Sequence, residues 1–105
     1  MSQNDDILMR IKDSVADSAP NATVILYGSF ARGENNKDSD LDLLILLEIE
    51  NISREDEIKI RYPLYDIEFD TGQIISPLVL SKTAWETKHK ISPFYKNVVM
   101  EGIIL

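Results

Sequence analysis

Residues 24–47 read VILYGSFARGENNKDSDLDLLILL, and this stretch carries the strongest structural signals of the chain. Its first part belongs to a β-branched, apolar run over residues 22–27, which predicts a short buried strand. Gly28 and Ser29 break that strand. Because Ser29 is a good N-cap residue, residues 30–32 are expected to form a short helix directly after the strand.

The second part of this stretch predicts a turn followed by another strand. Residues 33–39, GENNKDS, are polar and turn-forming, which is typical of a solvated loop. Residues 40–47, DLDLLILL, follow with apolar side chains on both faces. A strand that is apolar on both faces needs cover on both sides, so this strand is expected to lie inside the sheet and not at its edge.

Residues 51–71 carry two competing patterns. Ser53 followed by Asp56 is typical of a helix start, and Gly72 fits just past a helix end. Residues 65–70 instead alternate apolar and acidic side chains, as a strand would. We favour the helix, because its start and stop signals agree.

The helix interpretation gives this segment an apolar stripe formed by Ile58, Tyr62, Tyr65 and Phe69. At helical spacing, such a stripe is expected to pack into the core and not to stack on a nucleobase. Pro63 lies within the stripe and weakens both the helix and the strand interpretation.

The remaining segments extend the alternation of helices and strands. Residues 4–18 place apolar side chains at helical spacing and predict a helix. Residues 73–80 predict a third strand, in which Pro77 indicates an edge position or a bulge. A short helix is expected over residues 81–88, and a last helix over residues 93–100 begins with proline at its favoured first position.

The composition excludes several classes of protein. The chain has 105 residues, which fits one domain over residues 1–105 with a modest core. Its 11 basic and 18 acidic residues give a net charge of −7, so direct nucleic-acid binding is not expected. No apolar run approaches the ~20 residues that cross a bilayer, so no membrane association is expected. Without cysteine there is no disulfide or thiolate metal site, and we expect a cytoplasmic protein.

Asp40 and Asp42 form the first half of a candidate site. Two residues apart on a strand, their carboxylates point to the same face and repel each other. A hard divalent cation between them relieves that repulsion, and Mg²⁺ typically binds one or two carboxylates together with substrate phosphates. The pair therefore predicts a metal site that carries a nucleotide.

Gly28, Ser29 and Arg32 form the second half of this candidate site. Glycine allows a phosphate to approach the backbone, and the start of the following helix presents free N–H groups to it. The Ser29 hydroxyl adds a donor, and Arg32 lies one turn further on, where its guanidinium can bind a phosphate oxygen. A metal-binding and a phosphate-binding element are thus expected to face one ligand.

These motifs resemble the minimal nucleotidyltransferases of the DNA polymerase β-like superfamily. That group has the pattern Gly-Ser, ten residues, then Asp-x-Asp, and the run from Gly28-Ser29 to Asp40 and Asp42 matches it without a gap. The resemblance implies an α/β fold with a mixed β-sheet flanked by helices. It implies two Mg²⁺ ions on the catalytic residues Asp40 and Asp42, with the triphosphate of a nucleoside triphosphate, expected to be ATP, at Gly28 and Ser29. A hydroxyl then attacks the α-phosphate and pyrophosphate leaves.

One departure from the family pattern concerns a third carboxylate. Active members generally carry it on a following strand, beside the first two. If residues 73–80 form that strand, they hold no acid and Ser76 or a neighbour occupies the place. If residues 65–70 form it, one of their three acids could serve. Catalysis therefore depends on which segment is the strand.

Two functions follow from the resemblance. The first is a Mg²⁺-dependent transferase that moves AMP from ATP to a hydroxyl. Because the chain is short, the acceptor is expected on a partner protein, such as the helical HEPN partner of HEPN/MNT toxin–antitoxin pairs. The second is a catalytically impaired module that binds nucleotide or masks its partner, which the acidic surface would suit. A third interpretation, a free-standing transferase that acts on a small hydroxylated molecule, lacks a second pocket wall, which a homodimer could supply.

Overall fold

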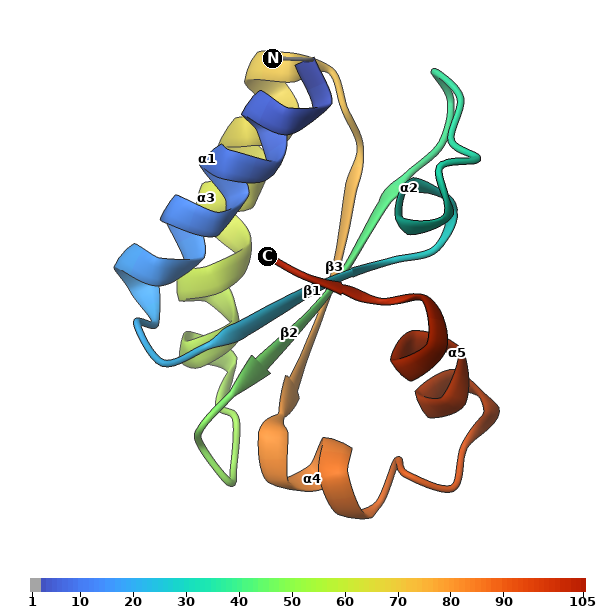
Figure 1. The fold of residues 1–105 in the computed structure, drawn as a ribbon. Coiled ribbons are helices and arrows are strands. Elements are labelled where there is room, and N and C mark those ends of the chain that lie inside the picture. Colours follow the sequence, from blue (N-terminus) through green and yellow to red (C-terminus); the bar gives the residue numbers. More distant parts are fainter. Residues whose placement is uncertain (1–2) are drawn as a thin grey trace.

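The structure, a computed structural model, describes residues 3–105 and contains one four-stranded sheet with helices on both faces (Figure 1). Along the chain the elements are α1 (Gln3–Ser18), β1 (Thr23–Tyr27), α2 (Ser29–Arg32), β2 (Leu41–Leu47), α3 (Arg54–Thr71), β3 (Ile75–Ser81), α4 (Lys82–Thr87), α5 (Pro93–Glu101) and β4 (Ile103–Ile104). The expected helices and the first three strands are confirmed to within a few residues.

The strand order is β3-β2-β1-β4, and the sheet is mixed. β1 pairs antiparallel with both β2 and β4, whereas β2 pairs parallel with β3. β2 therefore lies inside the sheet, as its apolar sequence predicts. Because of these directions, the end of β1 and the starts of β2 and β3 meet at one end of the sheet. This is the end at which α2 lies in Figure 1.

The two faces of the sheet have separate cores. Alternate residues of β2, among them Leu41 and Leu43, are fully buried against α1 and α3. Leu44 and Leu46 point the other way and pack with Trp85 of α4 and Val98 of α5. Figure 1 shows the same division, with α1 and α3 on one side of the strands and α4 and α5 on the other.

α3 confirms the helix interpretation of its segment and excludes the strand interpretation of residues 65–70. Ser53 and Asp56 form a reciprocal capping box, in which the Asp56 N–H donates to the Ser53 hydroxyl at 3.1 Å. Gly72 ends the helix in the left-handed conformation, at φ 76°. Pro63 is accommodated within the helix.

The prediction that the aromatic stripe of α3 packs into the core is wrong. Tyr62, Tyr65 and Phe69 are 58%, 45% and 90% exposed. The buried face of α3 is instead aliphatic and consists of Ile60, Leu64 and Ile67. Both stripes have helical spacing, and burial of the aliphatic one spares the tyrosine hydroxyls the cost of leaving water.

The two edges of the sheet differ in how they end. β3 is an edge strand, which agrees with Pro77 within it, and the Arg61 guanidinium donates to the Pro77 carbonyl at 3.0 Å. The other edge is β4, a two-residue strand that the sequence did not predict.

No helix within residues 3–105 combines the length and the apolar character that crossing a bilayer requires.

Candidate active site

Asp42 lies near the start of the interior strand β2, on the face that carries α4 and α5. It shares this face with Leu44 and Leu46, because side chains alternate along a strand. Its register partners are Tyr27 on β1 and Ser76 on β3. These three side chains form a row across the sheet, with the carboxylate in the middle.

Gly28 places the chain against this carboxylate. Its backbone, at φ 75° and ψ −155°, lies in a region that side chains other than glycine rarely allow. A Cβ at Gly28 would lie 2.5 Å from Asp42 Oδ2. Only glycine at this position therefore lets the β1–α2 turn and the Asp42 carboxylate pack together.

The expected helix cap at this turn needs a correction. Gly28, not Ser29, is the N-cap residue of α2, and no side chain caps the helix. Ser29 is the first helical residue, and within residues 3–105 its hydroxyl makes no hydrogen bond. The hydroxyl therefore remains available for an external ligand, which is the use expected of it.

The electrostatics of Asp40 and Asp42 favour a bound cation. Burial and the negative charge of Asp40 raise the pKa of Asp42, while Arg32 acts in the opposite direction. Within residues 3–105, no three His, Cys, Asp or Glu side chains gather as a metal site. Two carboxylates, one half-buried and one exposed, suit Mg²⁺, which completes its shell with water and substrate phosphates.

Arg32 has partners that the sequence did not indicate. Its guanidinium donates to Glu101 at the end of α5 at 2.9 Å and lies 3.5 Å from Glu34. The other Glu101 oxygen accepts the N–H of Gly28 at 3.2 Å. The hydrogen bond from Arg32 is the main cause that lowers the pKa of Glu101, so this carboxylate stays ionised. Glu101 is thus a site residue that no spacing rule could find, because it lies 73 positions after Gly28.

Comparison with known proteins assigns the family. The model of the nucleotidyltransferase domain matches residues 8–105. The chain belongs to this family. Among curated relatives from Methanocaldococcus jannaschii, the candidate protein adenylyltransferase MJ0604 is 31% identical over 85 residues, which are 78% of this chain and 75% of that protein. MJ1379, of the same description, is 25% identical over 99% of this chain and 95% of that protein.

A third relative matches over a shorter region. The candidate protein adenylyltransferase MJ0141 from the same organism is 38% identical over 61 residues, which are 57% of this chain. The matched region covers 60% of the length of MJ0141. The activities and substrates of these relatives therefore enter only as a proposal for this chain.

Solved structures confirm the fold. A candidate minimal nucleotidyltransferase has a TM-score of 0.61 at 24% identity and covers all of this chain and 97% of its own. A candidate nucleotidyltransferase from Sulfolobus solfataricus has a TM-score of 0.59 at 22% identity and covers 94% of this chain and 76% of its own. A toxin–antitoxin structure with AMP-PNP has a TM-score of 0.60 at 15% identity, over 96% of this chain and 71% of its own.

The position beside Asp42 in this nucleotidyltransferase domain is held by Ser76. β3 is the strand next to β2, and Ser76 is the register partner of Asp42 on it. The acids of the alternative segment lie on α3 instead: Asp70 pairs with Arg10 at 3.0 Å, and Glu68 accepts the Ile75 N–H at 2.7 Å. The third carboxylate of the family pattern is therefore absent from this strand.

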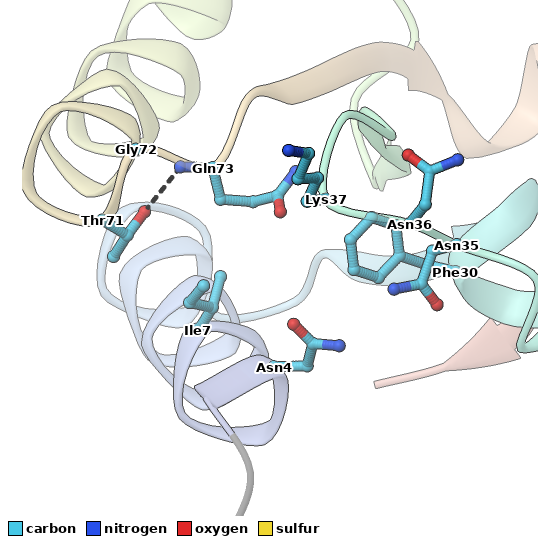
Figure 2. A pocket seen from close by; sticks show the side chains of 9 residues that line it. All are labelled: Asn4, Ile7, Phe30, Asn35, Asn36, Lys37, Thr71, Gly72 and Gln73. Atoms are coloured by element: carbon cyan, nitrogen blue, oxygen red, sulfur yellow. Dashed lines mark hydrogen bonds between the residues drawn. The ribbon is translucent and has the colours of Figure 1, made fainter.

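A cavity of about 380 Å³ lies at the same end of the nucleotidyltransferase domain but on the other face (Figure 2). It opens between the start of α1, α2, the loop before β2 and the end of α3 with the loop that follows it. Its lining residues are Asn4, Ile7, Phe30, Asn35, Asn36, Lys37, Thr71, Gly72 and Gln73. Ile7 and Phe30 belong to the core on the α1 and α3 side. None of the predicted site residues lines this cavity.

Proposed function

We propose that this domain transfers AMP from ATP to a hydroxyl group of a partner protein. The observation that carries the proposal is the half-buried Asp42 carboxylate, packed against Gly28 and repelled by Asp40 at the point where three strand ends meet. Membership of the nucleotidyltransferase family and relatives described as candidate protein adenylyltransferases support it. The use of ATP suggests a cytoplasmic location.

Each residue has a distinct task in this proposal. Asp40 and Asp42 would hold Mg²⁺, which when bound neutralises phosphate charge and orients the phosphates. Ser29 offers its hydroxyl to the triphosphate, and Gly28 allows the phosphates to approach the backbone. The acceptor oxygen forms a bond to the α-phosphorus, the bond to pyrophosphate breaks, and the acceptor proton leaves.

The chain offers little help with the acceptor proton. Ser76 is not a base at neutral pH. The carboxylates at the start of β2, Asp40 and Asp42, are the metal ligands of this proposal. A missing general base typically lowers a rate by about 10²–10⁴-fold. We therefore propose that transfer by the isolated domain is slow.

The acceptor in this proposal is a helical protein of the HEPN type. A toxin–antitoxin structure with AMP-PNP among the structural neighbours supports a protein partner. The net charge of −7 suits a basic surface on that partner.

Nucleotide binding is the first test. Titration calorimetry with ATP should show binding that requires Mg²⁺ in the wild type and is lost in Asp42→Asn. An exposed loop acid outside the site supplies the control, Asp38→Asn, which should bind as the wild type does. Absence of binding to the wild type under both conditions would contradict the proposed function.

The place of the third carboxylate allows a gain-of-function test. Ser76→Asp should raise AMP transfer to a co-purified HEPN-type partner, measured as an adduct by mass spectrometry, by one or more orders of magnitude. Ser76→Asn matches it in shape without the charge and should not. Equal rates in both variants would show that a missing base does not limit the reaction.

A second candidate function is masking of the partner without chemistry. Ser76 in the place of the third carboxylate and the net negative charge favour it. The discriminating protein is the double variant Asp40→Asn, Asp42→Asn, tested for neutralisation of the partner in cells. Full neutralisation supports masking, whereas loss of neutralisation by a folded variant supports AMP transfer.

A further inference from the structure

Glu101 joins the C-terminal segment to both motifs of the candidate site. One of its oxygens accepts the Gly28 N–H at 3.2 Å, and the other accepts from Arg32 at 2.9 Å. Its side chain is 23% exposed, the lowest value among the acids in the ion pairs of residues 3–105. The contact is therefore sheltered in comparison with an ordinary surface ion pair.

The fold holds Glu101 at this point through its neighbours. A Cβ at Gly102 would lie 2.8 Å from Ile25 Cγ2 and would clash with the Val98 carbonyl, so glycine lets the end of α5 pack closely on β1. β4 follows at once and pairs with β1 in the register Ile25 with Ile104. The end of α5 is thus fixed to the strand that leads into Gly28.

The Arg32 side chain interacts electrostatically with Asp42 as well as with Glu101 and Glu34. It is 44% exposed, and its charge already acts on Asp42. A free guanidinium would therefore be drawn toward the carboxylate that is expected to bind metal. Glu34, at 3.5 Å and 66% exposed, is a weaker and more solvated partner than Glu101.

We infer that Glu101 is a positioning residue of the nucleotide site, which holds Arg32 away from Asp42 and directs its free N–H groups toward a bound triphosphate. A guanidinium has five donors, and its contacts with Glu101 and Glu34 leave some of them unused. A fixed side chain loses less conformational entropy when it binds a ligand. The inference rests on the proposed function and names a residue that the family pattern at residues 28–42 does not contain.

The test measures the affinity for Mg·ATP and the Mg²⁺ concentration at which ATP binding is half-maximal. Glu101→Ala should weaken Mg·ATP binding about tenfold, as expected for the loss of one preorganised cationic contact. The half-maximal Mg²⁺ concentration should rise as well, because Arg32 then competes with the metal for Asp42. Glu101→Gln keeps the shape of the side chain and an acceptor for the Gly28 N–H. Its two binding values should lie between those of the wild type and those of Glu101→Ala.

Two controls separate positioning from a general structural effect. Glu48→Ala removes an acid from another ion pair, that with Lys82 at 3.8 Å, and should leave both binding values unchanged. In an Arg32→Ala background, Glu101→Ala should change the Mg·ATP affinity less than about twofold, because the guanidinium that Glu101 positions is absent. Circular dichroism at the titration temperature confirms that each variant is folded.

Each other outcome overturns the inference. Unchanged affinity in Glu101→Ala would show that the ion pair has no part in nucleotide binding. An equal loss with and without Arg32 would show that Glu101 acts through another contact, such as the one with the Gly28 N–H. Tighter binding in Glu101→Ala would show that the carboxylate competes with phosphate. A wild type that does not bind Mg·ATP overturns the proposed function and this inference together. A wild type that binds Mg·ATP, with variants that behave in one of the ways above, overturns this inference alone.

Discussion

Gly28 is constrained both by its own backbone and by the carboxylate beside it. At φ 75° and ψ −155° an alanine is strained, and its Cβ would lie 2.5 Å from Asp42 Oδ2. We expect Gly28→Ala to cost about 1–3 kcal/mol of unfolding free energy and to abolish Mg·ATP binding, since Asp42 must move. Denaturant unfolding and calorimetry measure the two effects.

Gly33 supplies the matched control for this substitution. It also has a positive φ, 71°, but no atom lies within 4 Å of the position its Cβ would take. Gly33→Ala should therefore cost about 1–2 kcal/mol from backbone strain alone and leave Mg·ATP binding intact. If both variants lost binding equally, the contact between Gly28 and Asp42 would not be the cause.

Asp42 carries a charge that the folded chain disfavours. Burial and Asp40 raise its pKa in the folded state, so the fold loses stability as the pH rises from the ordinary aspartate pKa through that raised pKa. Asp42→Asn should therefore unfold at a higher temperature than the wild type at pH 7. The difference should vanish as the pH falls through the raised pKa toward the ordinary aspartate value, where both side chains are neutral.

A series of thermal melts between pH 3 and pH 8 tests this prediction. The exposed Asp38 provides the comparison, since Asp38→Asn should show no such pH-dependent difference. A wild type more stable than Asp42→Asn at pH 7 would mean that Asp42 is stabilised by a partner. The repulsion argument for a cation would then fail.

The residues of the site differ in how far they could be predicted. Gly28, Asp40 and Asp42 lie within one short stretch, so spacing alone suggests that they act together. Glu101 comes from a distant helix, and a glutamate before a helix-ending glycine carries no local signal of its target. Its role depends on the pairing of β4 with β1, which only the tertiary structure shows.

At the scale of elements, α3 shows what sequence signals can and cannot determine. Its start and end were predictable, because a capping box and a left-handed glycine act within a few residues. Its buried face was not, because the aromatic and aliphatic stripes have the same period. β4 was missed because two residues are too short to show an alternation.

The two stripes of α3 differ in their expected contribution to stability. Leu64 is fully buried between the helix and the sheet, so Leu64→Ala should cost about 2–5 kcal/mol. Phe69 is 90% exposed, and Phe69→Ala should change the unfolding free energy by no more than about 0.5 kcal/mol. Urea unfolding of both variants checks the assignment of faces. A large loss in Phe69→Ala would contradict the exposed position of this side chain.

The whole molecule combines a rigid sheet end with an acidic surface. The strand order brings Gly28, Asp42 and Ser76 to one end without help from long loops. The 18 acidic residues outnumber the 11 basic ones, and several arginines are already paired: Arg10 with Asp70, Arg32 with Glu101 and Arg61 with Glu57. The net charge of −7 therefore disfavours the approach of a polyanion.

This balance of charge predicts that the chain discriminates between a metal-bound nucleotide and a nucleic acid. A single-stranded 20-mer oligonucleotide should bind more weakly than ~10⁻⁴ M at physiological salt, the weak end of the non-specific range, with or without Mg²⁺. Fluorescence anisotropy measures this, with Mg·ATP binding to the same preparation as the positive control. Lowering the salt should not strengthen oligonucleotide binding, because weaker screening increases the repulsion between the nucleic acid and a net charge of −7. Mg²⁺ neutralises part of the charge of a triphosphate, so Mg·ATP is repelled less. Micromolar binding of the oligonucleotide would reveal a cationic surface that the ion pairs described above do not neutralise, and the acceptor would then have to be sought among nucleic acids.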